Sequence, residues 1–195
     1  RPSAAIAHWP DAPHVIGGLD LEAGGTWLGL TESGRFAAVT NVREPGMAKG
    51  LVSRGSLTRN FLTADPPALT YAEGIAPDHY SGFNLLRADG ESLVYCSNRD
   101  GRPRTLQPGI YGLSNHLLDS PWPKLLAARQ AFAEALPSLP DETAFFDMLA
   151  DQCIVPDANL PRTGVSIEWE RLLSAVFVKS ENYGTRASTV VWQRS

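Results

Sequence analysis

The sequence has little of several features that reveal a protein's chemistry directly. Its 195 residues include only two cysteines, Cys96 and Cys153, which are too few for a disulfide scaffold and form no Cys-x-x-Cys pair. The four histidines have neither helical i, i+4 spacing nor a cysteine partner, so we expect no metal site. No apolar run approaches the ~18 residues of a membrane span, and no signal-peptide pattern opens the chain. We therefore expect a cytoplasmic protein with no membrane insertion.

Charge blocks and nucleotide-binding motifs are also missing. The net charge of −4 is spread without runs of one sign, which argues against nucleic acid or an anionic membrane surface as a partner. There is no βαβ alternation, Gly-rich phosphate loop or Gly-x-Ser-x-Gly elbow, so nucleotide binding and α/β-hydrolase chemistry have no support. With 43% apolar and 19% charged residues, the composition is that of a globular chain, which we expect to form one domain over residues 1–195.

The most informative stretch that is present runs from Gly24 to Arg43. Residues 26–30 and 36–42 are short apolar runs rich in aromatic and β-branched residues, separated by a polar turn that contains glycine. This pattern predicts a β-hairpin. Its second strand delivers the amide of Asn41 and the guanidinium of Arg43 into a Glu-Pro-Gly loop, which is a common way for a sheet to present a site.

The rest of the chain predicts further hairpins around a central group of helices. We expect additional strands at residues 4–9, 15–18, 83–87, 92–97, 110–113, 175–179 and 185–192. Helical spacing or capping signals predict helices at residues 53–62, 67–75, 123–136, 141–151 and 168–173. Because hairpins dominate both ends and the best helices cluster between residues 120 and 173, the fold class is expected to be α+β.

Amides and guanidiniums recur at the ends of the predicted strands. They are Asn41, Arg43, Asn84, Asn98, Arg99, Asn115 and Arg186. Amide donors aimed at a developing oxyanion, with an arginine to orient a carboxylate, suit acyl transfer or amide hydrolysis. The set contains no nucleophile, however, and each member taken alone is better explained as a turn amide or a surface ion pair.

Several motifs follow one another in order along the chain. They are Gly24-Gly25-Thr26-Trp27-Leu28-Gly29, Thr40-Asn41-Val42-Arg43-Glu44-Pro45, Gly82-Phe83-Asn84-Leu85-Leu86, Ser97-Asn98-Arg99, Tyr111-Gly112-Leu113-Ser114-Asn115, Pro121-Trp122-Pro123-Lys124 and Tyr183-Gly184-Thr185-Arg186. Together they resemble one known family, the NRDE-motif or transport-and-Golgi-organisation proteins. The family opens with Met-Cys, a strand and an Asn-Arg-Asp-Glu motif, and Arg1-Pro2 resembles the residues just after that motif. On this resemblance, we expect the family's first strands and its near-terminal cysteine to lie upstream of residue 1.

The resemblance also implies a fold and two functions that stay open. The family is similar to N-terminal-nucleophile hydrolases, which implies a four-layer αββα sandwich and amide or acyl hydrolysis by the upstream cysteine, with Asn41, Asn115 and Arg186 in the catalytic site. The alternative is a non-catalytic carrier of haem or lipid, with no resident cofactor and haem only as a ligand. Further ligand-binding candidates are Trp27, Arg43, Asn84 and His116, and an axial ligand to haem would come from His8, His14 or His116.

Overall fold

The computed structural model describes residues 2–193. The chain divides into two compact units. The first, here called the sheet unit, runs to Gly109 and also takes Asn115–Leu117. The second, here called the helical unit, takes Ile110–Ser114 and the chain from Leu118 onward.

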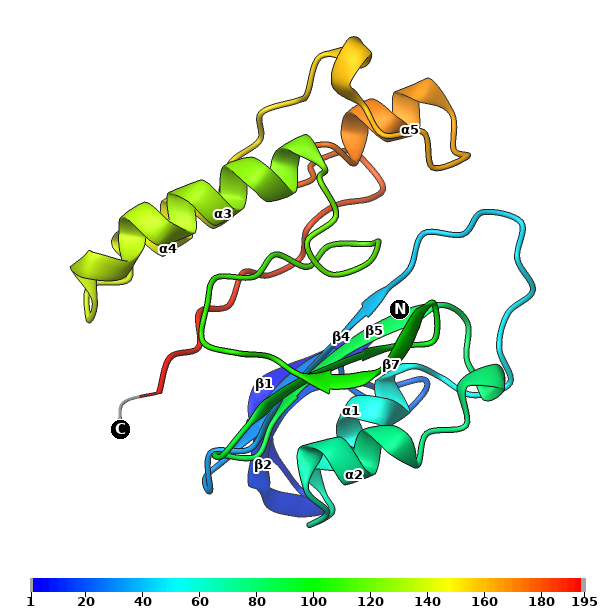
Figure 1. Ribbon diagram of the computed structural model, residues 1–195, viewed down its shortest axis with the longest axis vertical. Helices are drawn as coiled ribbons and strands as arrows, with labels where there is room; N and C mark the ends of the chain where they lie inside the picture. The colour runs from blue at the N-terminus through cyan, green and yellow to red at the C-terminus, as the bar shows by residue number, and fades with distance from the viewer. Residues whose placement is uncertain (1, 194–195) are drawn as a thin grey trace. The chain divides into compact units, whose positions relative to one another are not determined.

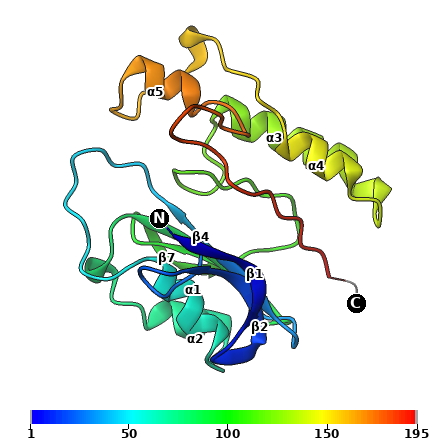
Figure 2. The same cartoon turned by 180° about the vertical axis from the view of Figure 1, so that it is seen from behind.

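The sheet unit is built on one antiparallel sheet of 7 strands, in which each strand pairs with its neighbours in sequence. The strands are β1 (Ser3–Trp9), β2 (Ala12–Asp20), β3 (Leu28–Thr31), β4 (Phe36–Asn41), β5 (Phe83–Ala88), β6 (Leu93–Ser97) and β7 (Asp100–Thr105). β1 and β7 form the two edges, and β4 lies in the middle (Figure 2). The strand that ends at Asn41 is therefore held on both sides by neighbouring strands.

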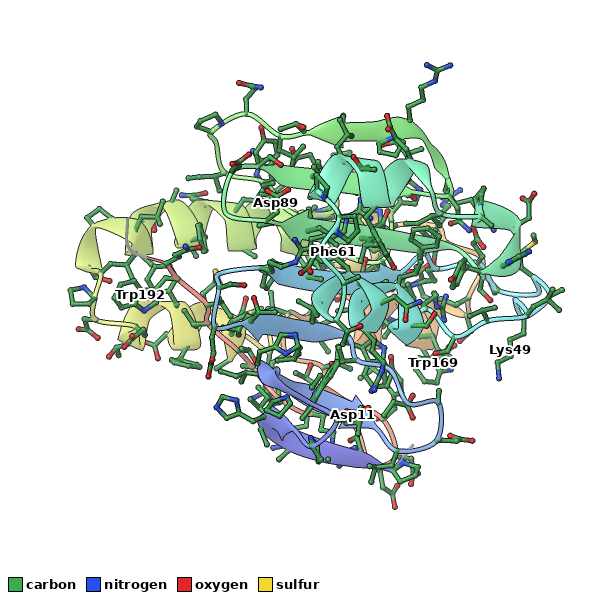
Figure 3. All side chains as sticks on the ribbon, turned by 90° about the horizontal axis from the view of Figure 1, so that it is seen from below. Asp11, Lys49, Phe61, Asp89, Trp169 and Trp192 are labelled. Carbon is green, nitrogen blue, oxygen red and sulfur yellow. The ribbon has the colours of Figure 1, made fainter. Side chains whose placement is uncertain are left out.

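Two helices, α1 (Gly55–Leu62) and α2 (Ala68–Glu73), cover one face of this sheet (Figure 1). Alternation along the strands places Val39 of β4 and Leu85 of β5 on this face, where both are buried. Phe61 of α1 is completely buried between helix and sheet (Figure 3). Apolar side chains at helical spacing thus meet the apolar face of the strands, which is the packing that the sequence pattern predicts.

The N-terminus of α2 is capped from the sheet. The sequence suggests Asp65 as the cap, but the backbone N–H of Ala68 donates to Asp89 Oδ2, at 2.7 Å, from the turn after β5. Backbone and side-chain hydrogen bonds, from Ala68 and Ser92 among others, outweigh the cost of burial and hold the pKa of the Asp89 carboxyl below its usual range. The cap of α2 is therefore Asp89, which is distant in the sequence, and not the neighbouring Asp65.

The helical unit contains α3 (Pro123–Ala135), α4 (Thr143–Leu149) and α5 (Ile167–Leu172). α3 and α4 pack through Phe132 and Phe145, whose ring centroids lie 5.3 Å apart in an edge-to-face arrangement. The first turn of α5 is capped by the Ser166 side chain, which accepts from the Trp169 backbone N–H. Within residues 2–193, no helix has the length and apolar character needed to cross a membrane.

The α+β class is confirmed, but several predicted strands are wrong. Residues 110–113, 175–179 and 185–192 form no regular strand, and a single bridge joins Lys179 to Gly184. A short apolar run becomes a strand only where a neighbouring strand pairs with it along its length. The sequence analysis also missed β7, a polar edge strand in which Pro103 is tolerated. The sheet of β1 to β7 is the only sheet in the described part of the chain, so the second sheet of an αββα sandwich is not found there.

Candidate functional site

The end of β4 joins two of the predicted site residues. Asn41 is the last residue of β4, and its backbone carbonyl accepts a hydrogen bond from the Asn115 side-chain amide at 3.1 Å. The Arg43 backbone N–H in turn donates to the Asn115 carbonyl oxygen at 2.8 Å. Segment 115–117 is therefore tied to the strand end by two hydrogen bonds. The sequence placed Asn41 and Asn115 at separate strand ends, and the structure brings them into direct contact.

Asn84 holds the same region from the opposite face of the sheet. It is fully buried, and its amide nitrogen donates to Thr40 Oγ1 at 3.1 Å and to the His116 carbonyl oxygen at 2.8 Å. Its amide oxygen accepts from the Tyr95 hydroxyl at 2.9 Å. These contacts fix segment 115–117 against β4 and β5. Asn84 is thus engaged inside the protein rather than facing a ligand.

A pocket of about 520 Å³ opens beside Asn41, on the face of the sheet that carries α1. Two predicted residues, Trp27 and Asn41, line it. The other lining residues are Glu22, Ala23, Lys49, Gly50, Leu51, Val52, Ser53, Arg54, Gly55 and Ser81. Residues 49–54 come from the segment between β4 and α1, so this connection supplies half of the residues in the pocket wall.

Gly25 explains how the Gly-Gly-Thr-Trp motif reaches this pocket. A Cβ on Gly25 would collide with the backbone of Gly55, the first residue of α1. Without it, the chain approaches so closely that the Thr26 N–H donates to the Gly55 carbonyl at 3.2 Å. This approach carries Trp27, whose side chain is half-exposed, to the pocket wall. The second glycine of the motif therefore permits a close backbone crossing.

The side-chain amide of Asn41 is available to a ligand. Among residues 2–193, none forms a hydrogen bond to this amide, although the backbone carbonyl of the same residue is held by Asn115. A donor on a fixed backbone, at the end of a central strand and facing a pocket, can bind a carbonyl oxygen without prior rearrangement. The predicted position of Asn41 at the end of a strand is confirmed, and its part in binding or catalysis stays a prediction.

The charged residues of the pocket wall are two cations and one carboxylate. Lys49 is exposed at the outer end of the loop (Figure 3). Arg54 is partly buried and donates from Nη1 to the Gly82 carbonyl at 2.9 Å, which orients its guanidinium. With Glu22, the wall carries a formal charge of one positive unit at neutral pH. Beside Trp27 and Leu51, this lining suits a ligand with both an apolar part and an anionic or polar part.

Sequence reasoning missed Lys49 and Arg54 as pocket residues. Arg54 falls within the helix predicted at residues 53–62, so nothing marked it as a pocket residue. The residues before it show no periodic pattern. The signal that could have found them is a connection of 13 residues between the end of β4 at Asn41 and the start of α1 at Gly55. Irregular connections of this length inside a compact unit are usually functional.

The remaining predicted residues lie elsewhere. Arg43 joins the site through its backbone, and the side chain of His116 is not part of the pocket wall. Arg186 is exposed and belongs to the helical unit. His8 and His14 are also absent from the lining. Within residues 2–193, no group of three or more potential metal ligands occurs.

Neither described cysteine has the surroundings of a nucleophile. Cys96 is buried, and burial raises the pKa of its thiol more than the neighbouring Arg87 guanidinium lowers it. Cys153 is exposed in the helical unit, where the Asp151 carboxylate raises the pKa of its thiol. No cysteine among residues 2–193 lines the pocket.

Two predicted residues of the Ser97-Asn98-Arg99 motif, Asn98 and Arg99, have structural partners. Arg99 forms an ion pair through two nitrogens with Glu44, at the start of the loop. Asn98 accepts from the Phe83 N–H at 2.9 Å and donates to the carbonyls of Pro77 and Tyr80 at 3.2 Å each. These side chains hold together the loops that surround the pocket.

Comparison with known proteins identifies relatives along nearly the whole chain. Residues 1–195 match the family model described as Transport and Golgi organisation 2. The Bos taurus Transport and Golgi organization protein 2 homolog is 38% identical over 213 residues, covering 98% of this chain and 76% of the relative. The Homo sapiens homolog is 35% identical over 211 residues, and the Drosophila melanogaster protein is 28% identical over 219 residues, with the same coverage.

Proposed function

The chain belongs to the Transport and Golgi organisation 2 family, and on this premise we propose that it supplies the substrate pocket and the oxyanion donor of an amide or acyl hydrolase. The proposed nucleophile is an N-terminal cysteine, which we expect upstream of residue 1. The observation that carries the proposal is the Asn41 amide, which faces a pocket with no internal hydrogen-bond partner among residues 2–193.

The proposal gives each residue a role that agrees with its position. In the first step the cysteine sulfur attacks the substrate carbonyl, and its proton passes to its own α-amino group. The Asn41 Nδ2 donates to the oxyanion that forms, and Asn115 is a positioning residue because it holds the Asn41 backbone carbonyl. The leaving amine or alcohol takes the proton, and water then hydrolyses the thioester. The role of Arg186 stays a prediction, since it lies in the other unit.

The substrate class follows from the lining of the pocket. Trp27, Leu51 and Val52 provide apolar surface, while Lys49 and Arg54 bring positive charge. A substrate with a hydrocarbon part joined through an amide or ester to a polar or acidic part fits this combination. Such a substrate places its carbonyl between the two parts, within reach of Asn41.

The test uses the full-length protein with its natural N-terminus and N-dodecanoyl p-nitroanilide as probe. We expect release of p-nitroaniline, and we expect Asn41→Ala to lower kcat about 10²–10³-fold, the usual effect of losing one oxyanion donor. The matched control is Asn60→Ala, an exposed asparagine on α1 that leaves the pocket intact. Hydrolysis by Asn41→Ala at the wild-type rate, in a protein with an unchanged melting temperature, would contradict the role of Asn41.

A non-catalytic carrier is the second candidate, and it needs only the lining of the pocket. The same apolar and basic lining would hold a fatty acid or the edge of a haem without any chemistry. None of the four histidines lines the pocket, so a haem held there would depend on its propionates and ring. Tight binding of dodecanoate or haemin by the full-length protein, with no amide hydrolysis, would select the carrier.

A further inference from the structure

The connection between β4 and α1 forms a wide loop that extends away from the sheet (Figures 1 and 2). Its shape is fixed although it has no regular secondary structure. The Gly50 N–H donates to Ser81 Oγ at 2.8 Å, and the Val52 N–H donates to the His79 carbonyl at 3.0 Å. A Cβ on Gly50 would collide with the backbone of Tyr80 and Ser81. The loop is therefore attached along residues 50–52, and residues 45–49 project beyond this attachment.

The loop presents large apolar side chains to solvent. Leu51 is 87% exposed, Met47 is 65% exposed and Val52 is 39% exposed. Leu51 lies between two residues whose backbone N–H groups are both tied to residues 79–81. These bonds fix the backbone on either side of Leu51 and hold its Cα at the surface. Exposed apolar residues gathered on one fixed segment mark an interaction site more often than single ones do.

The charge around the loop differs from the charge of the whole chain. The chain has 21 acidic and 17 basic residues, yet residues 45–64 contain no aspartate or glutamate and three basic residues, Lys49, Arg54 and Arg59. Arg59 is paired with Asp11, and Arg54 donates to the Gly82 carbonyl, so Lys49 is the cation that loop 45–52 itself presents. Glu44, just before the loop, is neutralised by its ion pair with Arg99. The net charge of −4 argued against an anionic surface as partner, but the local charge of this loop is positive.

We propose that loop 45–52 docks the protein on the surface of a bilayer that contains anionic lipid. Met47 and Leu51 would enter the interfacial region, while Lys49 would meet the lipid headgroups, which is the combination that peripheral membrane segments use. A narrow projecting loop suits this partner better than a protein, because a stable protein interface buries about 800 Å² on each side. The proposal does not depend on the proposed hydrolysis, although Lys49 to Val52 also line the pocket.

The test is sedimentation of the protein with sucrose-loaded vesicles of phosphatidylcholine alone or with 30% phosphatidylserine. We expect the wild type to bind the anionic vesicles and to lose binding in high salt. The double variant Met47→Ser/Leu51→Ser should bind about tenfold more weakly, and Lys49→Gln about fivefold more weakly. The matched control is Ile6→Ser, which removes an apolar side chain of similar exposure from β1.

Three outcomes would overturn the proposal. They are equal binding to both kinds of vesicle, wild-type binding by the double variant, and equal weakening by Ile6→Ser. Circular dichroism of each variant shows whether it is folded, so a loss of binding through misfolding is recognised. Hydrolysis of the soluble probe N-butanoyl p-nitroanilide, measured on Met47→Ser, separates the two proposals, because Met47 is not part of the pocket wall.

Discussion

The sheet unit and the helical unit bury their apolar side chains to different extents. In the sheet unit, a continuous cluster that includes Phe61, Leu85 and Val39 is closed between the sheet and two helices. In the helical unit, Phe146 remains 47% exposed and Trp169 remains 44% exposed. Aromatic residues of the helical unit contact each other in pairs, such as Trp169 with Tyr183, instead of filling one core. The difference indicates that the pocket beside Asn41 is built on the more stable part of the chain.

The largest expected effect comes from truncating one aromatic side chain in each unit. Phe61→Ala should lower the free energy of unfolding by about 3–5 kcal/mol, because it removes a fully buried ring from the cluster. Phe146→Ala should cost less than about 1 kcal/mol, because the ring is half-exposed. Urea unfolding followed by circular dichroism measures both. Equal losses would show that the two units are equally well packed.

Substitution of Arg87 should raise the free energy of unfolding instead of lowering it. Its guanidinium is completely buried beside the rings of Tyr71 and Phe61 and the Cys96 thiol, and none of its three nitrogens donates to an oxygen or nitrogen atom in the described chain. Arg87→Met should therefore stabilise the sheet unit by about 1–4 kcal/mol. The matched variant Arg35→Met should destabilise it, because Arg35 donates to the Phe61 and Pro66 carbonyls. Equal losses of stability in both variants would show that the Arg87 guanidinium makes a stabilising interaction in the folded protein.

Alkaline pH should weaken the sheet unit through Tyr71. Burial raises the pKa of the Tyr71 hydroxyl to about 12, and the hydroxyl donates to the Leu57 carbonyl at 2.9 Å. A pKa raised on folding contributes stability that is complete below pH ~10, the unfolded pKa, and is lost as pH rises toward 12. After allowance for solvent screening, this pKa shift contributes about 1–2 kcal/mol to the free energy of unfolding. The difference between wild type and Tyr71→Phe should shrink over this range, and a constant difference would contradict the assignment.

The smallest expected effect is confined to the helical unit. Ser166→Ala removes the side chain that caps α5 and should cost about 1 kcal/mol of local stability. Hydrogen exchange read by mass spectrometry should become faster in residues 167–172 and stay unchanged in β4 and β5. Faster exchange in both units would show that they unfold together, which would contradict a difference in stability between them.

The parts of the fold that the sequence predicted are those with strong local signals. The hairpin at residues 26–42, the Asp-Gly hairpin of β5 and β6 and the two longest helices all formed near their predicted bounds. The C-terminal hairpin did not form, because β-branched and aromatic residues show only that a segment can be extended. Asp89 as the cap of α2 could not be predicted either, since it depends on a contact between residues 21 positions apart.

The candidate site could likewise be predicted only where its residues lie in strong local patterns. Trp27 and Asn41 stand in a motif with a strong strand pattern, and the structure places both at one pocket. Lys49 and Arg54 come from an irregular loop whose course is set by contacts with Ser81 and Gly82. No local pattern encodes such contacts, so these residues emerged only from the structure. Asn84 had the same strand-end signal as Asn41, but the pleat of the sheet turns it to the other face.

The most direct test of the account follows the side-chain amide of Asn41 by nuclear magnetic resonance. The Asn41 resonances, assigned by comparison with Asn41→Ala, are recorded in ¹⁵N-labelled protein while N-dodecanoyl glycine is added. The account predicts that the Asn41 amide and the Trp27 indole shift together and saturate, while the buried Asn84 amide stays in place. Saturable binding that shifts other residues and leaves the Asn41 amide unchanged would contradict it.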